Sequence, residues 1–187
     1  MEARGRILDA SQTVLVEDGY AGFSMARVAE EFGGSQSLIH HYFEGKGDLL
    51  ATLVARERER TADGLGALPT DPAPRLDALV ETVVGNLEGG SEEAERTAAV
   101  FVELEAAARE YDDIARELFA IETLVREDLV DTVKRGVEAG AFESVDPSRV
   151  AELVLGANQR AASARLFGRE SETADALREL VVEQVRR

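Results

Sequence analysis

Residues 24–46 constrain the fold more than any other part of this chain, because they predict two short helices joined by a pair of glycines. Apolar residues recur at helical spacing in residues 25–32, directly after Ser24. Gly33 and Gly34 follow, and Ser35 then precedes a second short run, residues 36–42. Serine is a preferred first cap of a helix, and glycine suits a tight turn. The segment therefore predicts a helix-turn-helix, which is a DNA-binding motif.

The rest of the chain also predicts helices, so the expected fold class is all-α with about nine of them. All four prolines fall between periodic segments, and no stretch alternates apolar and polar residues as a strand would. Residues 68–74 predict a linker, and Gly19 and Gly140 predict helix ends. The expected helices cover about residues 2–18, 25–32, 36–42, 45–65, 75–88, 91–110, 112–139, 146–167 and 171 onward.

The acidic charge of the chain lies mostly outside this motif. The formal net charge is −16, yet residues 1–60 hold seven Lys and Arg against ten Asp and Glu, a net charge of −3. Only Lys46 and Lys134 are lysines, and this acidic, lysine-poor composition is typical of halophilic proteins. In molar salt the Debye length falls to about 3 Å, so a negative mean field would not repel DNA. The alternative is an ordinary acidic protein with an arginine bias.

The sequence lacks the patterns that would indicate an enzyme, a secreted protein or a membrane protein. It has no cysteine, which excludes disulfides and thiolate metal sites. Its start lacks an apolar signal region, and no apolar run approaches the roughly 18 residues of a membrane span, so we expect a cytoplasmic protein. No glycine-rich phosphate loop, Ser-His-Asp set or metal-ligand cluster is recognisable, and we expect neither catalysis nor a cofactor.

The N-terminal segment resembles the tetracycline-repressor (TetR) family of transcriptional regulators. The resemblance covers about residues 4–54 and depends on a combination of positions. These are Ile7, Leu8, Ala10, Gly19, Tyr20, Phe23, Ser24, Met25, Val28, Ala29, Gly33, Ser35, Ile39, Tyr42, Phe43, Lys46, Leu49 and Leu50. The resemblance implies a DNA-binding domain at 1–45, and an effector-binding and dimerisation domain at 46–187. It also implies a homodimer that forms through the last two helices, beginning near Asp146 and Ser171.

The same resemblance, together with residue chemistry, gives a candidate DNA-binding set. Gln36 can pair with adenine and Ser37 with either purine, although both could simply cap the helix. Tyr42 could point at a phosphate or pack on the next helix. His40 stands where many family members have tyrosine, so DNA affinity could depend on pH. The full set is Ser24, Arg27, Ser35, Gln36, Ser37, His40, His41, Tyr42 and Lys46, with Arg4 and Arg6 as weaker phosphate candidates.

A ligand pocket is harder to predict, because apolar stripes at helical spacing are more often plain core. Candidate lining residues follow the family's use of its second domain, with Glu103, Asn158 and Gln159 as polar groups. Asn158 and Gln159 could equally form hydrogen bonds across a dimer. The candidates are Phe101, Glu103, Leu104, Tyr111, Leu118, Phe119, Asn158 and Gln159.

Together these patterns favour a TetR-like regulator, a repressor that binds a double-stranded DNA operator and is released by a small, largely apolar effector. Two alternatives remain. One is a dimeric helical binding module without DNA binding, and the other is an enzyme. The operator and the effector are not encoded in any pattern of the sequence.

Overall fold

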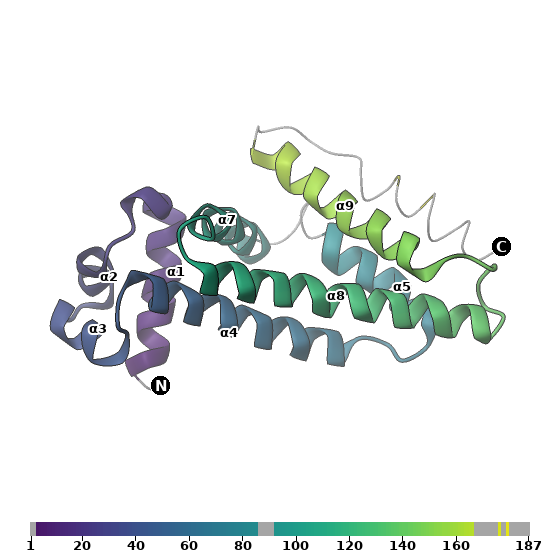
Figure 1. Cartoon of the computed structure of the whole chain (residues 1–187), viewed down its shortest axis with the longest axis horizontal. Coiled ribbons are helices and arrows are strands. Elements are labelled where there is room, and N and C mark those ends of the chain that lie inside the picture. The colour runs from purple at the N-terminus through teal and green to yellow at the C-terminus, as the bar shows by residue number, and fades with distance from the viewer. Residues whose placement is uncertain (1–2, 86–91, 167–175, 177–178, 180–187) are drawn as a thin grey trace. The chain divides into compact units, whose positions relative to one another are not determined.

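The computed structural model describes residues 3–85 and 92–166, together with 176 and 179, and these residues form helices and no strand (Figure 1). The expected all-α fold is confirmed. In chain order the elements are α1 (Ala3–Gly22), α2 (Met25–Phe32), α3 (Gln36–Tyr42), α4 (Lys46–Ala67), α5 (Pro72–Val80), the π-helical turn η1 (Glu81–Gly85), α7 (Glu92–Ala107), α8 (Asp112–Glu138) and α9 (Pro147–Leu166).

The chain divides into two compact units. Unit 1 comprises Met1–Thr61 and Arg96–Ile121, and unit 2 comprises Ala62–Glu95 and Glu122–Arg187. The first part of α4, most of α7 and the start of α8 thus pack with the N-terminal helices. The functional division that we expected at residue 45 stays a prediction, because compactness alone does not assign function.

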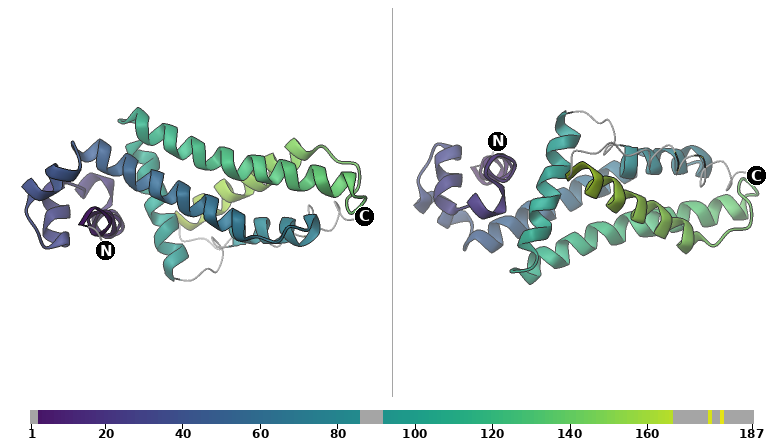
Figure 2. Two further views of the ribbon diagram at one scale, coloured as in Figure 1. Left: turned by 90° about the horizontal axis from the view of Figure 1, so that it is seen from below. Right: turned by 90° about the horizontal axis from the view of Figure 1, so that it is seen from above.

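Unit 1 is built around α1, whose apolar side chains are buried against α2, α4, α7 and α8. Ile7, Val14 and Leu15 of α1 are fully buried in the same core as Leu104 and Ile114. In Figure 2, α1 appears nearly end-on with α2 and α3 beside it, and α2 contacts both neighbours. The N-terminal helices therefore share one core with segments more than 80 residues later in the chain.

The helix-turn-helix forms as the sequence predicts. Ser24 and Ser35 are the N-caps of α2 and α3, and each accepts a hydrogen bond from a backbone N–H three residues later. Gly33 ends α2 in the left-handed region with φ 73°, where a side chain would add strain. Predicted caps and boundaries are confirmed for both helices.

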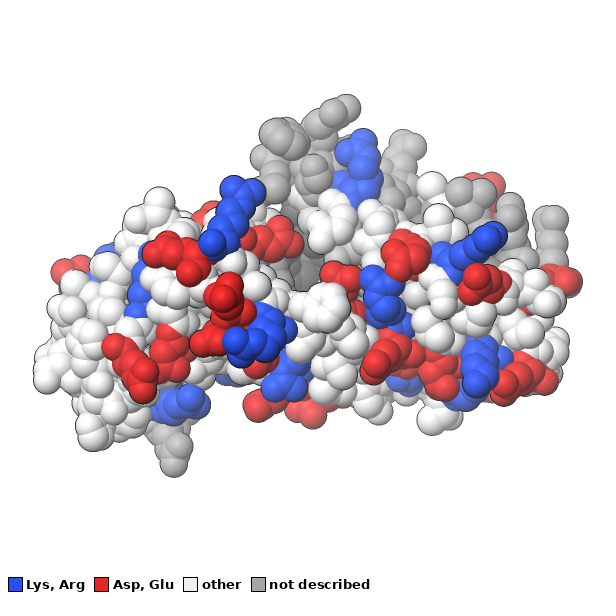
Figure 3. All heavy atoms as spheres, viewed as in Figure 1, with Lys and Arg blue, Asp and Glu red and all other residues white. Residues whose placement is uncertain are grey.

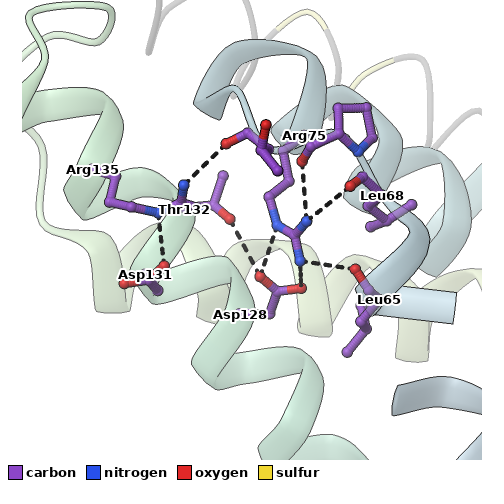
Figure 4. A network of polar contacts seen from close by, with 9 residues as sticks. Leu65, Leu68, Arg75, Asp128, Asp131, Thr132 and Arg135 are labelled. Carbon is purple, nitrogen blue, oxygen red and sulfur yellow. Dashed lines mark hydrogen bonds and ion pairs between the residues drawn. The ribbon is translucent and has the colours of Figure 1, made fainter. Parts of the chain in front are cut away.

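Unit 2 contains a second core and a dense polar network around Arg75 (Figure 4). The Arg75 guanidinium donates to both carboxylate oxygens of Asp128, at 2.9 and 2.6 Å. It also donates to the backbone oxygens of Leu65, Leu68 and Pro69 at 3.0, 3.3 and 3.0 Å. The last carbonyls of a helix lack partners within it, so Arg75 supplies partners at the end of α4 and holds α8 there.

Several expected boundaries were wrong in instructive ways. The helix α5 begins at Pro72, inside the expected linker, because proline suits the first turn of a helix. The helix predicted over residues 75–88 becomes the π-helical turn η1 after Val80. Gly19 (φ 65°, ψ 178°) produces a kink, and helical structure resumes up to Gly22. Of the helix expected from Ser171, the structure describes only residues 176 and 179, so that expectation lies almost wholly outside the described residues.

Among the described residues, none of the helices is both long and apolar enough to cross a membrane.

Candidate nucleic-acid interface

Five polar side chains of α3 form an exposed face, defined here as the reading face. Gln36, Ser37, His40 and His41 are exposed, and Tyr42 is 37% exposed. The other side of the helix is anchored, because Ile39 is fully buried and Phe43, directly after α3, is 2% exposed. A short polar helix on a buried apolar anchor is the arrangement that a major groove requires.

Two pairs of side chains on this face contact each other. Nε2 of Gln36 lies 3.4 Å from Nε2 of His40, one helical turn later. The rings of His41 and Tyr42 meet edge to face, with centroids 5.1 Å apart. The two neighbouring histidines therefore engage different partners. Within the described residues, no cluster of three or more His, Asp or Glu is placed to hold a metal ion.

The capping serines are exposed, but each hydroxyl already has a partner. Ser24 Oγ accepts from the N–H of Arg27, and Ser35 Oγ accepts from the N–H of Leu38, both at 3.2 Å. A hydroxyl keeps its own O–H donor while it accepts. Each serine can therefore cap its helix and still donate to a phosphate, and the predicted DNA contacts remain predictions.

Arg27, a predicted DNA contact, is surrounded by carboxylates. Its guanidinium lies 2.7 Å from Asp18, 3.1 Å from Glu17 and 3.4 Å from Glu31. Three negative groups compensate one positive charge, so little of that charge is left to attract a phosphate.

Lys46, the other predicted cation, is bound inside unit 1. Its ammonium donates to the backbone oxygen of Tyr20 at 3.0 Å and lies 3.8 Å from the centroid of that ring. Burial lowers the pKa of Lys46, while the nearby carboxylate of Glu110 opposes the change. The structure thus gives Lys46 an internal role that its position at a helix start did not reveal.

The kink of α1 is held by two carboxylates that the sequence did not connect with it. Glu103 accepts a hydrogen bond from the backbone N–H of Tyr20 at 2.6 Å, and Glu110 accepts one from the Tyr20 hydroxyl. Burial, reinforced by Glu110, raises the pKa of Tyr20. These partners are 83 and 90 residues from Tyr20 in the chain. No local pattern could have identified them.

Arg4 and Arg6, which the sequence ranked lower, carry charge that is less compensated. The Arg4 guanidinium lies 5.3 Å from the ring centroid of Phe43, and that of Arg6 lies 4.9 Å from the centroid of Phe32. Both side chains are exposed, and neither forms an ion pair with a carboxylate of the described residues. Their aromatic partners end α2 and follow α3, so these cations lie beside the helix-turn-helix.

The wider surface mixes both signs of charge. On the face seen in Figure 3, Asp and Glu side chains lie among those of Lys and Arg. Among the described residues, opposite charges also form ion pairs, such as Arg58 with Glu117 and Arg126 with Glu122. Near the reading face, a cation that is paired with carboxylates therefore has less charge to offer DNA than one without an ion pair among the described residues.

The predicted pocket residues do not come together in one unit. Asn158 and Gln159 belong to unit 2, whereas the other six belong to unit 1. Leu104 is fully buried in the core of unit 1 and Phe119 is 68% exposed. Glu103 binds the backbone of Tyr20. The predicted ligand-binding roles have no support from this arrangement and stay predictions.

Comparison with known proteins agrees with this geometry. Residues 7–53 match the family model described as bacterial regulatory proteins, tetR family. The chain is 31% identical over 116 residues to the HTH-type transcriptional regulator BetI of Brucella suis, covering 62% of this chain and 58% of that protein. It is 31% identical over 119 residues to the HTH-type transcriptional repressor KstR of Rhodococcus jostii, covering 62% and 55%. The matches thus span little more than half the length of these relatives.

Solved structures extend the likeness over almost the whole chain. A TetR transcription regulator from Haloarcula marismortui superposes with a TM-score of 0.82 at 25% identity, covering 98% of this chain and 96% of that one. A transcriptional regulator from Saccharomonospora viridis, solved in complex with choline, has a TM-score of 0.82 at 20% identity, with coverage of 99% and 98%. The second similarity shows a shared fold alone.

Proposed function

On the match over residues 7–53, we propose that this chain belongs to the tetR family of bacterial regulatory proteins and that it is a DNA-binding transcriptional regulator. The observation that carries the proposal is the reading face. Its polar side chains are exposed on a helix whose opposite side is fixed by Ile39 and Phe43. The relatives described above are transcriptional regulators and not enzymes.

In this proposal α3 enters the major groove, where Gln36 and Ser37 meet base edges. His40, His41 and Tyr42 donate to phosphates or sugars nearby, and Ser24 and Ser35 add hydroxyl contacts. Arg4 and Arg6 join the phosphate contacts because their charges are available. Arg27 and Lys46 belong to the predicted set, although both cations have internal partners.

We further propose a homodimer, since two half-sites about 34–36 Å apart require two reading faces. The described part of the predicted interface is α9. Leu153 is 58% exposed there, and a Cβ added to Gly156 would meet nothing within 4 Å. An apolar side chain next to an open backbone position supports close approach of a second helix.

We propose that the protein is a cytoplasmic repressor. A small-molecule effector would release it by weakening its binding to the operator. The relative KstR is named a repressor, and the Saccharomonospora viridis protein was solved with choline, so this fold accommodates a small molecule. Linkage requires that DNA weaken effector binding by the same factor. The largely apolar character of the effector is the sequence-based prediction.

An electrophoretic mobility shift on duplex DNA from upstream of the chain's own reading frame, run in high salt, tests the proposal. We expect a specific complex with the full chain. The double change Gln36→Ala with Tyr42→Ala should abolish or strongly weaken it, while Glu105→Ala, exposed on α7, should not. A folded dimer that shifts no DNA would instead favour the helical binding module. A complex that survives both α3 changes would show that another surface contacts DNA.

A further inference from the structure

The contact between Gln36 and His40 gives one polar pair of the reading face a defined geometry. The two Nε2 atoms are 3.4 Å apart, and the residues are separated by one helical turn. We propose that His40 is a positioning residue that holds the Gln36 carboxamide in the orientation that reads adenine. This inference rests on the proposed function, because it assigns specificity to a face that must first bind DNA.

The chemistry of the pair sets which groups of Gln36 are left for a base. A neutral imidazole has one donor and one acceptor nitrogen, so a Gln36 N–H that donates to Nε2 leaves the ring proton on Nδ1. The carboxamide nitrogen carries two N–H groups, and His40 uses one. One N–H donor and the Oε1 acceptor remain side by side.

That remaining pair matches adenine and mismatches guanine. In the major groove adenine presents the N7 acceptor and the N6 donor, which complement one N–H and one carbonyl oxygen. Guanine presents two acceptors, N7 and O6. With its second N–H engaged by His40, Gln36 would place Oε1 against O6 of guanine, and two acceptors repel.

The surroundings of the pair make this orientation persistent. Ile39, between the two residues in the chain, is fully buried, and Ser35 caps the start of the helix. The backbone that carries both side chains is therefore fixed. The neighbouring His41 contacts Tyr42 instead, so it does not compete for Gln36. A side chain held before binding loses less conformational freedom when it meets a base.

The test uses the full chain to enrich sequences from a pool of random duplex DNA, in parallel with four variants. We expect an adenine position that Gln36→Ala makes indifferent, with a loss of roughly 5- to 150-fold in preference over guanine. His40→Phe keeps a ring but no acceptor, and it should lower the preference at that same position about 2- to 12-fold, the value of one hydrogen bond.

His40→Asn should restore most of the preference, because an amide oxygen four residues later can accept from Gln36. His41→Phe is the matched control: it removes a proposed phosphate contact, so it should weaken binding to all sequences alike and leave the relative preference at that position unchanged. Circular dichroism of each variant checks that the helices are retained. We expect no loss, because all the substituted side chains are exposed.

The outcomes separate the two proposals. If the wild-type chain enriches no sequence, the proposed function fails, and this inference fails with it. If an adenine position depends on Gln36 but is unaffected by His40→Phe, the positioning role of His40 is overturned while the regulator stands. Relaxation of a different position by His40→Phe would also overturn it, since His40 would then read a base itself.

Discussion

Two cations beside the helix-turn-helix, Arg4 and Arg6, have surroundings opposite to those of Arg75 and Lys46, whose charged groups bind inside the packed units. Arg4 and Arg6 are exposed over the faces of Phe43 and Phe32. Arg75 uses its guanidinium on Asp128 and on backbone oxygens near the end of α4, and Lys46 binds the backbone and ring of Tyr20. Residue type alone therefore does not predict a DNA contact in an acidic chain, because a cation that already has internal partners has less charge to offer a phosphate.

Of these cations, Arg75 should contribute most to stability, because its guanidinium binds Asp128 and three backbone oxygens. We expect Arg75→Ala to lower the free energy of unfolding by about 3–5 kcal/mol, because it leaves the half-buried Asp128 without its partner. Urea denaturation of the variant measures the loss, with Arg4→Ala as the control that should change stability little. A loss below about 1 kcal/mol would mean that water replaces the network and that the contrast is weak.

Lys46 is both a predicted DNA contact and a cation with internal partners. Lys46→Met keeps an apolar stem but loses the hydrogen bond to Tyr20, so we expect the free energy of unfolding to fall by about 1 kcal/mol. The slope of log affinity for DNA against log salt should stay the same. If the slope instead falls by about 0.9, Lys46 neutralises a phosphate and leaves its internal partners when it binds DNA.

Arg4 and Arg6 give the converse result. Arg4→Gln and Arg6→Gln should each reduce the salt slope by about 0.9 without changing the unfolding midpoint, because each removes one phosphate contact. Fluorescence anisotropy of labelled operator DNA at several salt concentrations measures the slope. An unchanged slope in both variants would place these arginines outside the DNA contact.

Arg27 should show the smallest effect. Since Asp18, Glu17 and Glu31 surround its guanidinium, Arg27→Gln should leave the salt slope unchanged and lower the unfolding midpoint only slightly. The matched comparison is Arg4→Gln in the same assay. A slope reduced equally by both changes would show that these ion pairs open on DNA.

Features that depend on contacts between residues close together in the chain could be predicted from the sequence. Ser24, Ser35 and Gly33 act through bonds to residues three or four positions away, and their roles at the helix ends and in the turn were predicted correctly. Pro72 was misplaced in a linker because proline suits both a linker and the first turn of a helix.

Long-range partners account for the functional residues that the sequence could not assign. Glu103 as a pocket residue and Lys46 as a phosphate ligand stay predictions, but their contacts with Tyr20 could not be read from the sequence. The exposed face of α3 was predictable, because it needs only a helix and its apolar anchor. The pairing of each nearby charge needs the tertiary fold.

The shared core of unit 1 limits how this protein can be taken apart or recombined. Val100, Leu104, Ala107 and Ile114 fill the same interior as α1 and α4. A fragment that stops after residue 61 would expose those apolar core residues to water. A graft of residues 1–61 onto another regulator would place the same side chains against residues that do not complement them. Binding specificity should therefore be exchanged between relatives by substitutions on α3. The N-terminal helices should be transferred only together with α7 and the start of α8.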